Sequence, residues 1–527
     1  MSSRISAAAP TPLPASANLR HLRLDAKRLV KAARQGDPDA LARLAPLRAD
    51  AVKLADAQAA VAREHGFASW ALLKLRIAEL DFTRAGAAEK RLAFIDAACA
   101  AGWDRASTAA PDLAEAMLAA APELQRDDFL VACLAGEVDL VRPAIDRDPA
   151  VVRQPLAPRG WEPLLYVAYD VLLRPGRRRA DGIVAVARLL LERGADPNCS
   201  YAVADGSSFP ALYAAIAVSD NLALARLLLE AGANPNDNQS LYHAAERPDT
   251  DGLELLVAHG VRPADLSYCL LHKIDFQDEA GIRWFLDHGA DPNARHPKSG
   301  ESSLHWAIKR ASSRRVIELL LERGVDPDAR TLGGETAYPT VLGSTPLDVA
   351  RRLGREDVVE LLRKRGAQES PATPEDAFVF ACAAGDAAAA RSQLAADPGL
   401  VGRVAAVDRD LVAHLAQQER PAGVALLVEL GFDPSVVGWM GTALHWAACR
   451  GDAALARTLL ARGAPMLDVG GLFKTPIHTV LSHRWSRGAA DHAGVLEALV
   501  AAGAAVPEGF GQTGNGALDA ALARLRG

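Results

Sequence analysis

Apolar residues recur at helical spacing along most of the chain, in runs that end at one short phrase. The runs LLLERGADPN at 189–198, LLLEAGANPN at 227–236 and LLLERGVDPD at 319–328 show it most clearly. Leucines three and four positions apart place one apolar stripe on a helix. Glycine ends a helix because it adopts the left-handed backbone without a Cβ penalty, and proline cannot continue one. Each run is therefore predicted to be a helix that stops at the glycine and turns away at the proline.

The phrase returns with a period near 33 residues. Its glycines are Gly194, Gly232, Gly260, Gly289, Gly324, Gly366, Gly431, Gly463 and Gly503. Degenerate copies occupy 131–152 and 380–401. Ahead of each long run a shorter, Leu- and Ala-rich segment, such as 302–310, predicts a first helix. Because no such helix pair buries its apolar faces alone, this periodicity predicts an all-α solenoid of stacked helix pairs.

Composition agrees with close-packed helices. Half of the 527 residues are hydrophobic but only 5% are aromatic, so Ala, Leu and Val fill the core. This mixture favours helices over β-sandwiches, whose strands are rich in β-branched and aromatic residues. At about 33 residues per repeat, instead of the roughly 100–200 residues of an ordinary domain, the chain is long enough for about twelve stacked units after an N-terminal segment.

The openings of several units carry a second motif. They read EPLLYVA (162–168), SSLHWAI (302–308), TPLDVA (345–350), TALHWAA (442–448) and TPIH (475–478). These openings resemble the T-P-L-H-x-A signature of ankyrin repeats, and with the GADPN phrase the resemblance spans about residues 90–525. It implies a β-turn and two antiparallel helices per unit, stacked into a curved array with a concave binding surface. The predicted fold is thus an ankyrin-repeat solenoid.

The resemblance is weaker in places. The units at 90–150, 265–290 and 376–418 lack the opening and are ankyrin-like by position alone. Insertions interrupt the period at 174–182, 331–344 and 482–493.

We predict five segments. They are a disordered tail (1–17), an N-terminal helical cap (18–82), a repeat array (90–368), a joint (369–375) and a C-terminal array (376–527). The cap reads as three or four short helices, with Asp37-Pro38 as a helix start and Gly66 as a break. Its 62–74 stretch is similar to a helical segment often found ahead of bacterial ankyrin arrays. Covering the first unit's apolar face is its favoured role, and a recognition or dimerisation module centred on Trp70 is the alternative.

The joint, QESPATP, holds two prolines in a small polar stretch. Because the next unit starts at once and keeps the period, one solenoid with a flexible joint is favoured over two separate arrays.

Charge and cysteine content narrow the function. The net charge of −6 excludes a whole-protein basic surface, so nucleic acid is an unlikely partner. Six cysteines, none in a CxxC pair, indicate neither a disulfide framework nor a zinc ribbon. The N-terminus lacks an apolar signal-peptide core, and no apolar stretch reaches about 18 residues. We expect a cytoplasmic protein with no membrane partner.

Histidines recur at the fourth position of the opening, at His305, His445 and His478. Recurrence at one repeat position, with other residues there in neighbouring copies, predicts that they satisfy backbone groups of the adjacent turn rather than hold a metal. Trp306 and Trp446, which follow two of these histidines, are predicted to pack in the core.

Other candidate chemistry is sparse. The glycines of a GxGxxG at 509–514 follow a proline and lack a βαβ unit, so they predict a loop before the last helix rather than a nucleotide site. Asp127-Asp128 predicts a helix start. The basic run of Arg174, Arg177, Arg178 and Arg179 predicts a solvated loop, with an arm for phosphate or an acidic partner as the alternative. No catalytic, cofactor-binding or metal-ligating residue is predicted, and the chain is expected not to be an enzyme.

The ankyrin resemblance implies where a partner would bind, namely at the turn tips and the ends of the first helices. The matching residues, all expected to be exposed, are Trp161, Tyr169, Asp170, Arg247, Lys309, Arg310, Trp439, Met440, Arg450 and His483. Large amphipathic side chains and arginines are typical of interface hot spots. The predicted function is a binding module or scaffold that contacts another protein through its concave face.

The alternative function is an enzyme or small-molecule binder. Its pocket would lie where the 368–375 segment bends the array, lined by Trp439, His445, Trp446 and Arg450. Under this alternative the partner would be a small molecule.

Overall fold

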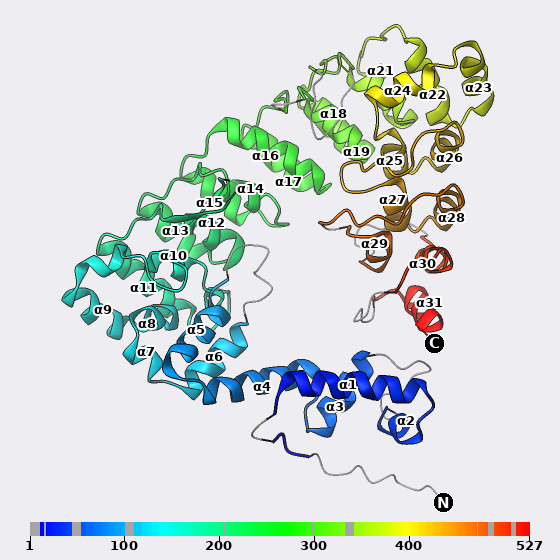
Figure 1. Cartoon of the computed structure of the whole chain (residues 1–527). Coiled ribbons are helices and arrows are strands. Elements are labelled where there is room, and N and C mark those ends of the chain that lie inside the picture. The colour runs from blue at the N-terminus through cyan, green and yellow to red at the C-terminus, as the bar shows by residue number, and fades with distance from the viewer. Residues whose placement is uncertain are drawn as a thin grey trace, which may run out of the picture. The chain divides into compact units, whose positions relative to one another are not determined.

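The computed structural model describes residues 11–14, 17–44, 54–100, 110–204, 206–296, 299–332, 342–471, 473–482, 490–506 and 513–526. Within these residues the chain is mostly helical, as the hydrophobic pattern predicts (Figure 1). It forms two compact units, of which the first comprises Met1–Asp25 and Gln58–His272 and the second comprises Ala26–Ala57 and Lys273–Gly527.

Four helices fall in the described part of the predicted N-terminal segment. They are α1 (Leu19–Arg34), α2 (Pro38–Leu44), α3 (Leu54–Glu64) and α4 (Trp70–Arg84). The carboxylate of Asp37 accepts the Ala40 N–H at 2.8 Å and so caps α2. Gly66 takes a positive φ of 83° between α3 and α4. The predicted helix start and break are both confirmed.

The remaining helices up to residue 275 form the repeats of the first unit, with α16 running into the second. They are α5 (Ala87–Ala98), α6 (Pro111–Ala120), α7 (Leu124–Asp127), α8 (Phe129–Ala135), α9 (Val138–Arg147), α10 (Pro163–Ala168), α11 (Ala180–Glu192), α12 (Ala211–Tyr213), α13 (Leu222–Glu230), α14 (Ser240–Ala244), α15 (Asp251–Ala258) and α16 (Pro263–Asp275). Short helical turns accompany them at η2 (Pro149–Arg153), η3 (Val171–Leu173) and η4 (Ala214–Val218).

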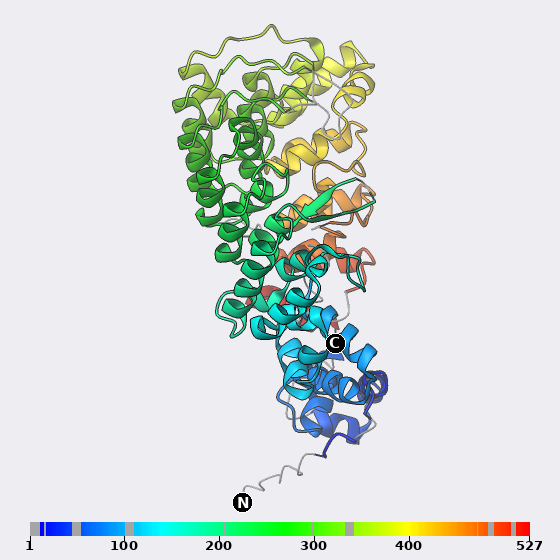
Figure 2. The ribbon, with the colours of Figure 1, turned by 90° about the vertical axis from the view of Figure 1, so that its left-hand side faces the viewer.

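One β-hairpin interrupts this helical unit and was not predicted. Its strands β1 (Ser200–Ala202) and β2 (Ser208–Pro210) are antiparallel (Figure 2). Their register places Tyr201 opposite Phe209.

The second unit continues the helix pairs. They are α17 (Glu279–Asp287), α18 (Ser303–Lys309), α19 (Arg314–Glu322), α20 (Pro346–Arg352), α21 (Glu356–Lys364), α22 (Pro374–Ala384), α23 (Ala387–Ala396), α24 (Leu400–Val407), α25 (Leu411–Gln417), α26 (Pro421–Glu429), α27 (Ala443–Arg450), α28 (Ala453–Ala461), α29 (Pro476–Ser482), α30 (His492–Ala501) and α31 (Gly516–Arg526). The degenerate copies also form helix pairs, at α8–α9 and α22–α23. The last helix, α31, forms as predicted, and Gly509 and Gly511 of the GxGxxG lie outside the described residues.

The α18–α19 pair shows why the repeat phrase has its sequence. Ser313 caps α19 by accepting the Val316 N–H at 3.3 Å. At the other end Gly324 takes a φ of +82°, and the Val325 N–H reaches back to the Leu320 carbonyl at 3.2 Å. This pattern is a Schellman cap, which satisfies carbonyls that the ending helix leaves open. The predicted role of this glycine is confirmed.

The last residue of the GADPN phrase connects one repeat to the next. The Asn198 side chain donates to the Gly232 carbonyl at 3.1 Å and accepts the Asn234 N–H at 2.8 Å. Asn293 makes the same pair of bonds three repeats further along, to the Gly324 carbonyl at 3.0 Å and from the Asp326 N–H at 2.7 Å. The asparagine therefore ties neighbouring turns together at the repeat period.

The histidines of the opening do the structural work expected of them. His305 is fully buried, its Nδ1 accepts the Ser302 N–H at 3.2 Å, and its Nε2 donates to the Ser344 carbonyl of the next repeat at 3.0 Å. His445 forms the equivalent bonds to Thr442 and Lys474, at 3.2 Å and 3.0 Å. Each ring thus caps its own helix and holds the following turn.

The seams between helices are small and apolar. Ala307 and Ala350 are fully buried, and Trp306 and Trp446 are buried core residues, as predicted. All six cysteines are buried free thiols. In the described part of the chain, no helix has both the length and the apolarity needed to cross a membrane.

Candidate functional site

A row of aromatic and histidine rings follows the first helices of successive repeats in the first unit. We call it the aromatic row; it consists of Trp161, Tyr169, Tyr201, Phe209, Tyr213, Tyr242, His243, Tyr268 and His272. Neighbouring ring centroids lie between 3.7 and 6.4 Å apart. In a chain with only 5% aromatic residues, this continuity sets one face of the unit apart.

The β-hairpin joins two parts of the row. Tyr201 on β1 stacks on Trp161, with centroids 4.7 Å apart and ring planes at 19°. Phe209 on β2 contacts both Tyr201, at 5.5 Å, and Tyr213 of α12, at 5.3 Å. The cross-strand register therefore carries the ring contacts from the α10 repeat to the α12 repeat.

Accessibility changes along the row. Tyr169 and Tyr213 are fully buried, whereas Tyr201 and Phe209 are half-buried. At the α16 end Tyr268 is 49% exposed. The buried rings hold the row in place. The outer rings present an apolar surface with polar groups at the ring edges.

A carboxylate lies beside the α14–α16 part of the row. Glu246 accepts from His243 at 3.1 Å and lies 3.4 Å from Nε2 of His272. Burial raises the pKa of Glu246, but its bonds to the two histidines outweigh burial and lower that pKa to about 2. Arg247 pairs with Asp220 at 2.8 Å and Asp249 at 3.1 Å. The charged groups named here are thus each held by a neighbouring side chain.

Three residues predicted as exposed contacts in this unit are buried, which corrects the expectation. Trp161 is 8% exposed, and Tyr169 and Asp170 are fully buried. Tyr201 covers Trp161, and Asp170 accepts the Leu172 N–H at 2.8 Å inside the core. Burial raises the pKa of Asp170 well above its ordinary value. Arg247 is half-buried.

The predicted residues of α18 are also buried, against expectation. Lys309 is 6% exposed and pairs with Glu301 at 2.9 Å. Arg310 is 4% exposed and lies between the rings of Trp306, at 4.4 Å, and Trp439, at 3.9 Å. Repeats more than a hundred residues apart therefore meet across the inner side of the second unit.

Helix α25 also contacts α18 across the inner side of the second unit. Gln418, at its C-terminal end, donates to the Ile308 carbonyl of α18 at 2.7 Å. Trp439 and Met440 are half-buried. Arg450, also half-buried, pairs with Glu419 at 3.3 Å. The structure brings Arg310 and Trp439 together, and His483 lies outside the described residues.

A pocket of ≈ 530 Å³ lies in the second unit. The residues that line it come from before and after the predicted joint (369–375) in the sequence. Three inter-helix turns line it, at 311–314, 355–357 and 417–420. None of the four residues predicted for a pocket at the bend lines it. Its lining is polar, with three arginines matched by three acidic residues.

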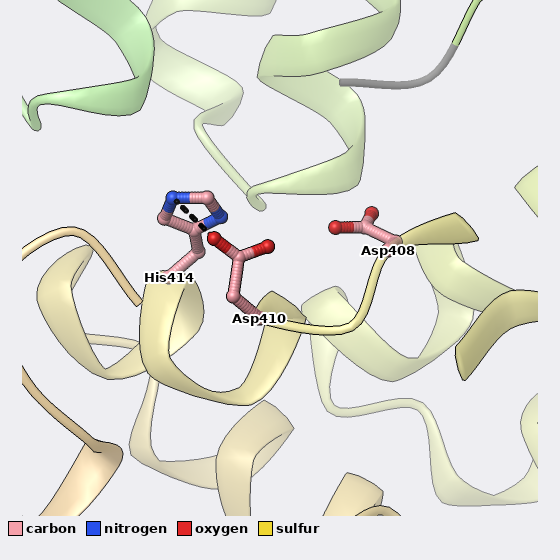
Figure 3. A group of neighbouring side chains, drawn as sticks. All are labelled: Asp408, Asp410 and His414. Carbon is pink, nitrogen blue, oxygen red and sulfur yellow. Dashed lines mark ion pairs between the residues drawn. The ribbon is translucent and has the colours of Figure 1, made fainter. Parts of the chain in front are cut away.

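Three buried side chains of the types that can ligate a metal lie close together, at Asp408, Asp410 and His414 (Figure 3). The His414 Nε2 is 3.5 Å from Asp410 Oδ2. Arg352 donates twice to Asp408 Oδ2, at 3.2 Å and 2.9 Å. Burial lowers the pKa of His414, and its carboxylate neighbours only partly offset this effect.

The basic run lies in a partly exposed loop, as expected, but three of its arginines are also paired with acidic residues. Arg177 pairs with Asp112 of α6, Arg178 with Glu115 of α6 at 3.3 Å, and Arg179 with Glu137 at 2.9 Å. These arginines fasten the insertion to helices that precede it in the chain. Asp128 is the N-cap of α8, as predicted, and accepts the Val131 N–H at 2.9 Å.

Family models of ankyrin repeats match two parts of the chain, residues 270–371 with three copies and residues 441–470 with one. The chain contains ankyrin repeats. Ankyrin repeats are generally protein–protein interaction modules. Among solved structures, the chain is similar to the crystal structure of the human ASB11 ankyrin repeat domain, with 20% identity and a TM-score of 0.20, over 45% of this chain and 98% of that one.

Sequence reasoning missed part of the row. Ankyrin resemblance locates Trp161 and Tyr169, but Tyr201 and Phe209 lie between the repeat phrase and the next opening, where no motif marks them. The available signal was compositional, since aromatic residues gather at 161–213.

Proposed function

We propose that this chain is a non-catalytic ankyrin-repeat module that binds a protein partner through the aromatic row of its first unit. The continuous ring contacts, ending in accessible rings on α14 and α16, carry this proposal. They lie on the first helices, where the ankyrin resemblance implies partner contacts.

The physical basis is the preorganisation of the outer rings. Tyr242 stacks on His272 at 3.7 Å and contacts Tyr268 at 6.3 Å. Rings already held by neighbours lose little side-chain freedom on binding, and aromatic side chains dominate interface hot spots. Their polar edges allow hydrogen bonds to a partner without leaving a buried group unpaired.

The second unit offers less for this role at its inner side. Lys309 and Arg310 already have internal partners and are nearly inaccessible. The ≈ 530 Å³ pocket is polar rather than apolar, unlike the usual small-molecule site. These observations favour a protein partner over the small-molecule alternative.

We also propose that the module acts in the cytoplasm as a scaffold. Six buried cysteines kept as free thiols suit a reducing compartment. Two units, of which only one carries the aromatic row, suit a protein that holds more than one component.

The test is affinity capture from the source cell, comparing the unmodified chain with a Tyr242→Ala, Tyr268→Ala double variant. We expect the double variant to lose its specific partner at least tenfold. Leu140→Ala is the matched control, because Leu140 is an exposed apolar residue (37%) on α9 of the same unit. A partner set unchanged by the double variant would overturn the proposal.

A further inference from the structure

We propose that Asp408, Asp410 and His414 form a site for one divalent transition-metal ion of the zinc class. This inference is independent of the aromatic row, since all three residues belong to the second unit.

The geometry provides three protein ligands. Each residue offers one ligand atom, and these atoms lie within 4.8 Å of one another. Asp410 is the N-cap of α25 and His414 lies four positions on, so one helical turn places them on the same face. Asp408 immediately follows α24 (Figure 3). Two carboxylates and an imidazole are a donor set that Zn²⁺ binds readily.

Asp410 provides a second observation that points to a cation. It is 4% exposed, and its Oδ1 has no hydrogen-bond partner within the described residues. Figure 3 shows its carboxylate directed toward His414. A buried carboxylate oxygen without a hydrogen-bond partner is costly, and a bound cation removes that cost.

The cations nearby are engaged with other carboxylates. Lys309 pairs with Glu301 at 2.9 Å and Arg310 with Asp275 at 2.6 Å. Arg352 is shared between Asp376 and Asp408. A divalent ion would add positive charge beside the two carboxylates of the site.

Arg352 has a positioning role in this site. Both of its bonds to Asp408 fall on Oδ2, which leaves Oδ1 able to coordinate while the arginine holds the carboxylate in place. A bound ion would join the turn ahead of α25 to the helix itself. Because α25 contacts α18 through Gln418, the ion would stabilise the closed inner side of the second unit.

The first test measures Zn²⁺ binding to the full chain after chelator treatment, by calorimetry and elemental analysis. We expect one ion per chain, and at least tenfold weaker binding in Asp410→Asn and in His414→Gln. Asp386→Asn is the matched control, because Asp386 also caps a helix of this unit but is remote in the chain from the three ligands. Failure of the unmodified chain to retain Zn²⁺, Mn²⁺ or Fe²⁺, or undiminished binding by Asp410→Asn, overturns the proposal.

Two further measurements distinguish metal binding at these three residues from metal binding by cysteine and from a loss of folding in the variants. With Co²⁺ in place of Zn²⁺ we expect d–d absorption without the sulfur-to-metal charge-transfer band that cysteine ligation would give. Without metal, Asp410→Asn should melt at the same temperature as the unmodified chain or higher, since it removes a buried unpaired charge. A lower melting temperature of this metal-free variant, or a strong charge-transfer band, would contradict the assignment.

Discussion

At the scale of single residues, the asparagine of the GADPN phrase explains more than its proline does. Proline only turns the chain away after the helix has ended, whereas Asn198 bonds to two backbone groups of the next turn. Another repeat of the chain has a different residue at the position of Asn198. Asp328 replaces the asparagine in one repeat and keeps only the acceptor bond, to the Gln368 N–H at 2.7 Å.

Asn198→Ala should therefore lower the free energy of unfolding by about 1 kcal/mol, since two exposed hydrogen bonds are lost. Asn198→Asp keeps the acceptor, as Asp328 does, and should lower the free energy of unfolding by about half as much. Urea denaturation followed by circular dichroism measures both. Equal effects of the two substitutions would contradict the bridging role.

The buried histidine of the opening predicts a dependence of stability on pH. Burial lowers the pKa of His305 to about 4, below the ordinary value of about 6.5. Between these values the unfolded chain binds the proton and the folded chain does not, so stability is full above about pH 6.5 and falls as the pH drops toward 4. This residue alone would account for a loss of up to ~3 kcal/mol.

His305→Gln should reduce that loss. At pH 7 it should lower the free energy of unfolding by about 1–3 kcal/mol, because Gln can complete a capping box with Ser302 but leaves the Ser344 carbonyl without its donor. Denaturation midpoints measured from pH 4 to pH 7 test this expectation. Adding His445→Gln should flatten the profile further, since burial also lowers the pKa of His445. A slope that is the same in all three proteins would refute it.

Single residues differ in how far their environment can be predicted from the sequence. The structural role of His305 was predictable because its bonds lie within one repeat and its neighbour. The burial of Arg310 was not, because its ring partner Trp439 lies 439 − 310 = 129 positions away. A repeat motif specifies contacts between neighbours and says nothing about repeats that meet across the inner side.

At the scale of elements, helix starts and ends followed from the sequence because caps, glycines and prolines act locally. The β-hairpin and the arginine contacts of the 174–182 insertion did not follow, since both depend on packing against other repeats. Close helix packing is a further case. Gly182 of α11 lies so near the end of α8 that an added Cβ would be 2.7 Å from the Gly136 carbonyl oxygen.

Gly182→Ala should destabilise the chain by about 1–3 kcal/mol through this overlap, although alanine is the better helix former. Gly402→Ala is the matched control, because Gly402 lies in α24 with nothing near its missing Cβ. That control should stabilise the chain by about 0.5–1 kcal/mol. Thermal melts of the two variants should move in opposite directions, and a shift of the same sign would contradict the packing argument.

At the scale of the whole molecule, the repeat period predicted stacked helix pairs but not the two units. The second unit closes its inner side through α18 and α25, whereas the first presents its aromatic row. Period and motif are nearly the same in both units. The difference comes from side chains that the ankyrin motif leaves variable, and those side chains determine which surface is available to a partner.

The central claim is that the aromatic row contacts the partner. The most direct measurement places a photo-cross-linking phenylalanine analogue at Tyr268 or, as a control, at Leu140 of the same unit, both of which are exposed. After irradiation in the source cell we predict a discrete cross-linked protein from position 268 and none from position 140. The same products from both positions, or products from position 140 alone, would contradict the claim.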